Sequence, residues 1–117
     1  MRVWKYSTPG VVGGTWEQLG QDIDWGGRYD KTGQSVKLNN DGTVVAVGGS
    51  GQGSNNRYGL VRVYSYSTPG LSGGTWEQIG SSDQKIGGNY NDKIGSEEIS
   101  LSSDGLTFAV SAIENIG

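Results

Sequence analysis

An internal repeat constrains this chain more than any other feature of its sequence. The stretch YSTPGVVGGTWEQLG occupies residues 6–20, and YSTPGLSGGTWEQIG occupies residues 66–80. When residues 1–20 are aligned with residues 61–80, 14 of the 20 positions are identical. Self-similarity at a fixed period marks an architecture built from repeated structural units, so the fold has to be one that tandem copies can make.

The similarity extends, with small slips, almost to the end of the chain. It closes with VKLNNDGTVVAVGG at residues 36–49, which is matched by ISLSSDGLTFAVSA at residues 99–112. We therefore divide the 117 residues into repeat 1, residues 1–60, and repeat 2, residues 61–117.

Each repeat is expected to contain four short strands. Most of the segments alternate apolar and polar side chains with a period of two, which is typical of a strand with one buried face. Residues 43–49 and 106–112 are almost all apolar instead, as in a strand buried on both faces. An Asp-Gly pair precedes each of these two and predicts a tight hairpin turn with Gly42 and Gly105 at positive φ. The predicted strands are residues 2–6, 15–20, 35–39, 43–49, 60–66, 75–80, 98–102 and 106–112.

These patterns predict an all-β fold, because no segment shows the period of an amphipathic helix. A four-stranded antiparallel unit repeated every few tens of residues is typical of the blades of a β-propeller. A single eight-stranded β-sandwich is the alternative. It accounts for the number of strands but not for the near identity of the two copies.

Short glycine-containing motifs indicate a family. Repeat 1 holds TGQSV at residues 32–36 and VAVGG at residues 45–49, and YGLVRVYSY follows at residues 58–66. Repeat 2 matches with IGSEEI at residues 94–99 and FAVSA at residues 108–112. These segments resemble FG-GAP repeats, the β-propeller repeats of the integrin α head and of many microbial secreted proteins. That family has Phe-Gly-x-Ser-Val, Gly-Ala-Pro and Gly-x-Val-Tyr-Val-Tyr at the corresponding places.

The resemblance implies an order of strands within each blade. It places one complete blade of four antiparallel strands at about residues 33–80. Residues 1–32 would supply the two outer strands of another blade, and residues 81–117 the two inner strands of a third. Closed propellers have about four to eight blades, so one blade flanked by two half-blades cannot close by itself.

We therefore expect copies of the chain to associate head to tail, each completing the half-blade of the next. The product would be a closed ring or an open filament. A chain that is a piece of a longer secreted propeller protein is the alternative. The residues expected at the contact come from the first and last strands: Arg2, Val3, Trp4, Tyr6, Phe108, Val110 and Ile113.

Charge favours this arrangement weakly. Residues 1–60 carry six basic and five acidic side chains, a net charge of +1, whereas residues 61–117 carry three and seven, a net charge of −4. Opposite ends of the chain would therefore attract, within the roughly 8 Å over which charges act at physiological salt.

The composition argues against most kinds of enzyme. The chain has no cysteine and no histidine, so it lacks thiol nucleophiles and the commonest general base and metal ligand. The neighbouring carboxylates Glu97 and Glu98 would point to opposite faces of a strand, which is wrong for two groups that act on one bond. We expect a non-enzymatic protein without a cofactor, and the resemblance implies an extracellular, adhesive role.

Other partners are disfavoured by charge and hydropathy. A net charge of −3 does not suit nucleic acid, which needs a basic surface. No apolar run approaches the roughly 20 residues of a membrane-spanning helix, and the chain does not open with a signal peptide.

Two loops remain as candidate sites. Trp25, Arg28 and Tyr29 lie in a loop whose copy in repeat 2 lacks the tryptophan, and they are our candidate ligand-binding cluster, with a glycan as the candidate ligand. The calcium loop of the FG-GAP family is reduced here to an Asp-Gly turn, and the carboxylates at 22, 24 and 30 do not have EF-hand spacing, so we predict no metal site.

Trp16 and Trp76 are expected to pack between blades.

Overall fold

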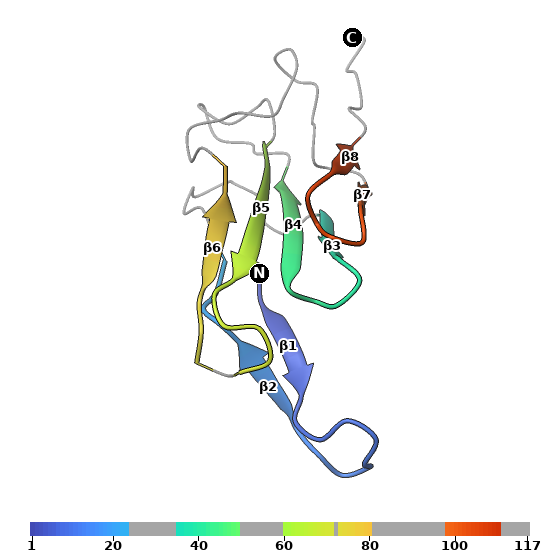
Figure 1. The fold of residues 1–117 in the computed structure, drawn as a ribbon, viewed down its shortest axis with the longest axis vertical. Coiled ribbons are helices and arrows are strands. Elements are labelled where there is room, and N and C mark those ends of the chain that lie inside the picture. The colour runs from blue at the N-terminus through green and yellow to red at the C-terminus, as the bar shows by residue number, and fades with distance from the viewer. Residues whose placement is uncertain (24–34, 50–59, 72, 81–97, 111–117) are drawn as a thin grey trace, which may run out of the picture.

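The computed structural model describes residues 1–23, 35–49, 60–71, 73–80 and 98–110. Within these ranges it contains eight strands and no helix (Figure 1). Each strand lies inside one of the eight segments predicted from the sequence, which confirms the all-β class. The strands are β1 (Val3–Tyr6), β2 (Trp16–Leu19), β3 (Ser35–Leu38), β4 (Val44–Gly49), β5 (Leu60–Tyr66), β6 (Trp76–Ile79), β7 (Ile99–Leu101) and β8 (Phe108–Val110).

The strands form three antiparallel sheets rather than the two sheets of a sandwich. The central sheet has the order β3-β4-β5-β6, and the hairpins β1-β2 and β7-β8 are separate two-stranded sheets. Figure 1 shows the β1-β2 hairpin extending beyond the end of the central sheet where β5 finishes, and β7-β8 beside β3 and β4. Among the described residues no sheet closes on itself.

Strand β4 is buried on both faces, as its apolar sequence predicts. Val45, Ala46 and Val47 are all fully buried. Because successive side chains of a strand point to opposite faces, Val45 and Val47 serve one core and Ala46 another. The first core joins them to Val3, Ile23, Tyr66 and Trp76, and the second joins Ala46 to Val61 and Ile99. The central sheet is thus covered by the β1-β2 segment on one face and by β7-β8 on the other.

The two Asp-Gly hairpins confirm the predicted positive φ of their glycines, with φ of 76° at Gly42 and 77° at Gly105. The connection is longer than the predicted tight turn. The N–H of Asn39 donates to the carbonyl of Val44, so this pair encloses a loop of four residues, and Ser102 and Thr107 enclose the second loop in the same way. Four-residue hairpin loops are commonly built around a type I turn.

Side chains inside these loops explain the greater length. Oδ1 of Asp41 accepts hydrogen bonds from the backbone N–H and the hydroxyl of Thr43, at 3.1 and 2.6 Å. Oδ1 of Asp104 accepts from the N–H of Leu106 and the hydroxyl of Ser102, at 2.9 and 2.7 Å. Each aspartate therefore satisfies loop donors that a two-residue turn would not have.

The repeated segments at residues 6–20 and 66–80 form a second kind of hairpin loop. In β1-β2 the hydroxyl of Tyr6 accepts from the N–H of Gly14 at 2.8 Å, and the tyrosine at position 66 makes the same bond with Gly74 at 2.8 Å. A Cβ at Gly14 would lie 2.2 Å from Oγ1 of Thr8, and one at Gly74 would lie 2.3 Å from Oγ1 of Thr68. The same hydrogen bond to a tyrosine hydroxyl and the same close packing around a glycine therefore fix both loops.

The two turn glycines predict different costs of substitution. At Gly42 an added Cβ meets no atom within 4 Å, so Gly42→Ala should cost only backbone strain, about 1–2 kcal/mol. At Gly105 an added Cβ would lie 2.5 Å from Cβ of Val44, so Gly105→Ala should cost more. Chemical denaturation measures both values. Gly42→Asn is the control and should cost less than Gly42→Ala, because asparagine tolerates positive φ. Equal stabilities of the two alanine variants would contradict the packing of Gly105 on Val44.

Candidate self-association surface

Residues 19–23 form a corner that joins the β1-β2 hairpin to the central sheet. Nε1 of Trp76 donates to the carbonyl of Leu19 at 2.7 Å. The side-chain amide of Gln21 accepts from the N–H of Trp76 at 2.8 Å and donates to its carbonyl at 2.9 Å. A Cβ at Gly20, whose φ is +75°, would lie 2.6 Å from Cδ1 of the Trp76 ring. The ring is left only 3% exposed, so the corner closes over it.

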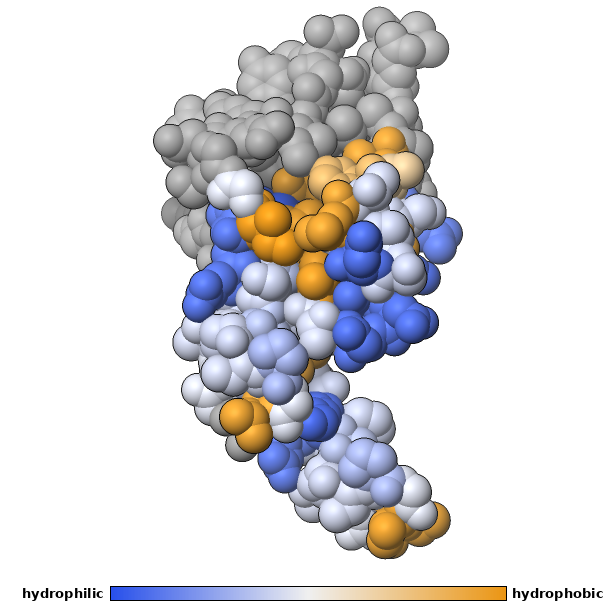
Figure 2. Space-filling model, viewed as in Figure 1, coloured by the Kyte–Doolittle hydropathy of each residue, from blue (hydrophilic) through white to orange (hydrophobic). Residues whose placement is uncertain are grey.

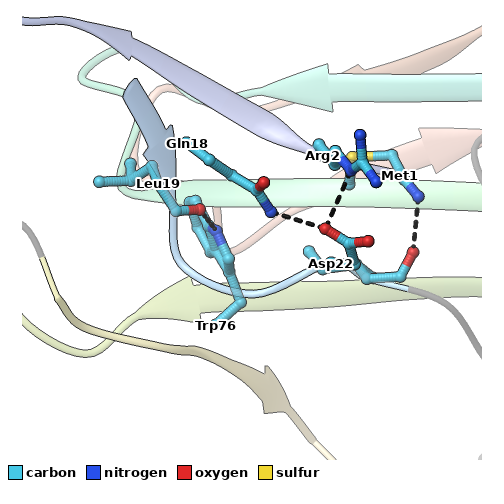
Figure 3. A network of polar contacts seen from close by, with 7 residues as sticks. Met1, Arg2, Gln18, Leu19, Asp22 and Trp76 are labelled. Carbon is cyan, nitrogen blue, oxygen red and sulfur yellow. Dashed lines mark hydrogen bonds and ion pairs between the residues drawn. The ribbon is translucent and has the colours of Figure 1, made fainter. Parts of the chain in front are cut away.

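A polar network holds this corner against β1 (Figure 3). Nε of Arg2 and Nε2 of Gln18 both donate to Oδ1 of Asp22, at 3.0 and 2.6 Å. The hydrogen bond from Arg2 is the main reason that the pKa of Asp22 lies below its ordinary value of 3.8. The terminal ammonium of Met1 donates to the carbonyl of Ile23 at 2.9 Å, and the N–H of Ile23 donates back to the carbonyl of Met1 at 2.8 Å. Because the ion pair is exposed, it positions the corner more than it stabilises it.

The predicted association residues of the N-terminal strand lie along β1 in different surroundings. Val3 is 7% exposed and its side chain packs in the first core, so it is not exposed to a partner chain. Trp4 is 50% exposed. The ring of Tyr6 meets that of Trp16 at 5.4 Å between centroids, and its hydroxyl is bonded within its own loop.

The predicted association residues at the other end lie on β8. Phe108 and Val110 are half-buried and pack on the second core. Ile113 lies outside the described residues, as do Trp25, Arg28 and Tyr29 of the candidate ligand-binding cluster. The structure therefore places the described candidate contact residues on or next to two strands of separate sheets, β1 and β8, and does not bring them together.

The hydrogen-bond alternation of the hairpins shows which backbone groups face the free sides of β1 and β8. Bonded and non-bonded pairs alternate along an antiparallel ladder. Ser7–Thr15 is a bonded pair, so Lys5–Glu17 is bonded as well. The pairs between and beyond these two, Tyr6–Trp16 and Trp4–Gln18, are non-bonded. The N–H and C=O of Trp4 thus point away from β2. By the same count from the bonded pair Ser102–Thr107, the backbone groups of Phe108 point away from β7. Within the described ranges, neither side has a partner strand.

Two small hollows flank β1. One, of about 240 Å³, lies between β1 and the β3-β4 loop and is lined among others by Trp4, Asp41 and Gly70; the surface is visibly notched there (Figure 2). The other, of about 260 Å³, lies between β1-β2 and the β5-β6 loop. Both are smaller than the roughly 300–1,000 Å³ typical of ligand pockets.

The described residues hold no group of three or more metal-ligating side chains. Asp22, the described member of the three aspartates considered from the sequence, is engaged by Arg2 and Gln18. Those residues also include no helix long and apolar enough to cross a membrane. Comparison of the chain with protein-family models, with curated proteins and with solved structures gives no match.

Sequence reasoning missed two features of this surface. It expected Trp16 and Trp76 to be packed alike, yet Trp76 is buried whereas Trp16 is 66% exposed, so the expected burial is found for Trp76 and not for Trp16. It also overlooked Gln21, which differs from its counterpart in repeat 2, Ser81. The available signal was that the near-identity of the two copies ends at this point, since residues 21–25 (QDIDW) match residues 81–85 (SSDQK) at no position.

Removal of the Gln21 amide should loosen the corner. Gln21→Ala leaves the N–H and C=O of Trp76 without their side-chain partners and should lower the free energy of unfolding by about 1–3 kcal/mol. Gln21→Glu keeps the acceptor for the N–H and loses the donor for the carbonyl, so its loss should be smaller. Urea denaturation followed by tryptophan fluorescence measures both; no loss in Gln21→Ala would show that the corner does not depend on this clamp.

Acid should destabilise the protein through three aspartates. Hydrogen bonds lower the pKa of Asp22, Asp41 and Asp104 below 3.8; the first donor is Arg2 for Asp22, the Thr43 side chain for Asp41 and the Leu106 N–H for Asp104. A carboxyl whose pKa is lower in the folded state stabilises the fold above its unfolded pKa and loses that contribution as pH falls through the folded value. Stability should therefore decline from about pH 5 downward. A variant with all three replaced by asparagine should show a flatter decline in chemical denaturation at successive pH values, and an unchanged slope would contradict the assignment.

Proposed function

We propose that this chain is a non-enzymatic structural module of β-propeller type that associates head to tail with copies of itself. The observation that carries the proposal is that β1-β2 and β7-β8 correspond by sequence to complementary halves of the central sheet. The first corresponds to β5-β6 and the second to β3-β4. Each hairpin lacks, among the described residues, the half that the central sheet possesses.

The central sheet supplies a template for the missing pairing. Its strands follow in the order expected of a blade from inner to outer strand, and β4 pairs with β5 through Val45–Tyr64 and Ala46–Val63. The repeat alignment relates 45 to 108 and 64 to 4. Transferred between chains, this register pairs Phe108 of one copy with Trp4 of the next. These are the residues whose backbone groups face the free sides of β8 and β1.

The packing of the three sheets also supports a blade-like arrangement. The outer-type hairpin β1-β2 packs on Tyr66 and Trp76 of the outer strands, and β7-β8 packs on β3 and β4, the inner strands. Propeller blades stack in this face-to-face way. An isolated two-stranded hairpin is marginally stable in water, so completion by a neighbour would also stabilise the ends of the chain. The FG-GAP resemblance and an extracellular, adhesive setting remain part of the same proposal.

Replacement of Trp4 separates backbone pairing from side-chain contact. Trp4→Pro removes the N–H that would bond to Phe108 of the neighbour and should shift sedimentation velocity profiles toward the monomer. Trp4→Ala is the matched control, because it removes the same half-exposed ring and keeps the N–H. Proline is tolerated on edge strands, so both variants should stay folded by circular dichroism. Equal association of the two variants would contradict strand pairing, and a monomeric wild-type chain would contradict the proposal as a whole.

A further inference from the structure

Two repeat-related tryptophans lie in opposite surroundings. Trp76 is 3% exposed and Trp16 is 66% exposed. Their own hairpins do not cause the difference, because each ring contacts the tyrosine opposite it similarly, at 5.4 Å for Tyr6–Trp16 and 5.2 Å for Tyr66–Trp76. The difference is the corner of residues 19–23, which closes over Trp76 and has no equivalent over Trp16 among the described residues.

Repeat 2 contains the beginning of a second such corner. The offset of 60 residues relates Leu19 to Ile79 and Gly20 to Gly80. Gly80 has a φ of +91°, close to the +75° of Gly20, so the two glycines share the left-handed backbone conformation. At Gly20 an added Cβ would meet the Trp76 ring, whereas at Gly80 it would meet nothing within 4 Å. Ile79 is 38% exposed. The described part of this corner, Ile79 and Gly80, thus repeats the residues that contact Trp76, and no described residue contacts it at Gly80.

We propose that Trp16 of one chain inserts beneath the Ile79–Gly80 corner of a second copy of this chain. Within one chain, Trp76 contacts Leu19 and Gly20. The proposed contact is the equivalent one between two chains. Nε1 of Trp16 donates to the carbonyl of Ile79, which is a backbone acceptor and so does not depend on the identity of that side chain. The inference rests on the head-to-tail association proposed above and adds a face-to-face contact to its strand pairing.

One arrangement of the copies satisfies both contacts. If β7-β8 of a first chain completes β1-β2 of a second, the composite sheet lies next to the central sheet of the first chain. The corner at the end of β6 in the first chain then lies over Trp16 of the second chain. Within one chain, the corner at the end of β2 lies over Trp76 in the same way. The Gln21 clamp is not reproduced, because the equivalent position is Ser81. Burial of the Trp16 ring and its Nε1 bond therefore carry the contact.

The contact joins two different patches, so variants that each disable one patch should complement one another. Trp16→Glu disables the ring and Ile79→Glu disables the corner. Each variant alone should associate at least about tenfold more weakly than the wild type in sedimentation velocity, as expected for loss of a central tryptophan. An equimolar mixture, at concentrations between the wild-type and variant dissociation constants, should form a dimer that grows no further. Val12→Glu, at a fully exposed position on the β1-β2 tip, is the control and should assemble as the wild type does.

The outcomes separate this contact from self-association in general. If the wild type assembles and both glutamate variants assemble equally well, the contact is wrong and head-to-tail association stands. If both variants are weakened but their mixture forms no dimer, Trp16 and the corner do not meet each other. A wild type that stays monomeric overturns the proposed function as well. Circular dichroism confirms folding, and Trp16→Ala with Ile79→Ser replaces the pair if a glutamate variant does not fold.

Discussion

The burial of β4 on both faces is the constraint on which the rest of the structure depends. Val45 and Val47 hold the β1-β2 segment through Val3 and Ile23, and Ala46 holds β7-β8 through Ile99. A polar substitution on either face would expose one of these cores. The hairpins pack on the sheet by their faces, and no strand among the described residues pairs with their outer sides.

The eight strands could be predicted because each carries its own local pattern of alternation or continuous hydrophobicity. The positive φ of Gly42 and Gly105 followed from turn chemistry. Loop length did not follow, since it depends on which donors the side chains of Asp41 and Asp104 satisfy. The opposite burial of Trp16 and Trp76 could not follow from local sequence at all, because Trp-Glu-Gln stands at both places and only tertiary packing distinguishes them.

The two repeats form similar hairpin loops but differ in the contacts that their hairpins make with other sheets. The loops of β1-β2 and β5-β6 are each held by a hydrogen bond to a tyrosine hydroxyl of the same hairpin, so each forms in its repeat without help from neighbouring strands. Contacts between sheets are different, because each needs a repeat on the adjoining side. In this account the chain satisfies one full set of such contacts internally and offers the two halves of another set at its ends.

Amide hydrogen exchange at Trp4 and Phe108 tests the account most directly. In each hairpin the N–H of these residues points away from its partner strand, and no described strand of the same chain pairs with it. We predict slow exchange of both amides in concentrated protein and fast exchange on dilution, while amides of the buried strand β4 stay protected throughout. Fast exchange of Trp4 and Phe108 at all concentrations would contradict the pairing of chains through these strands.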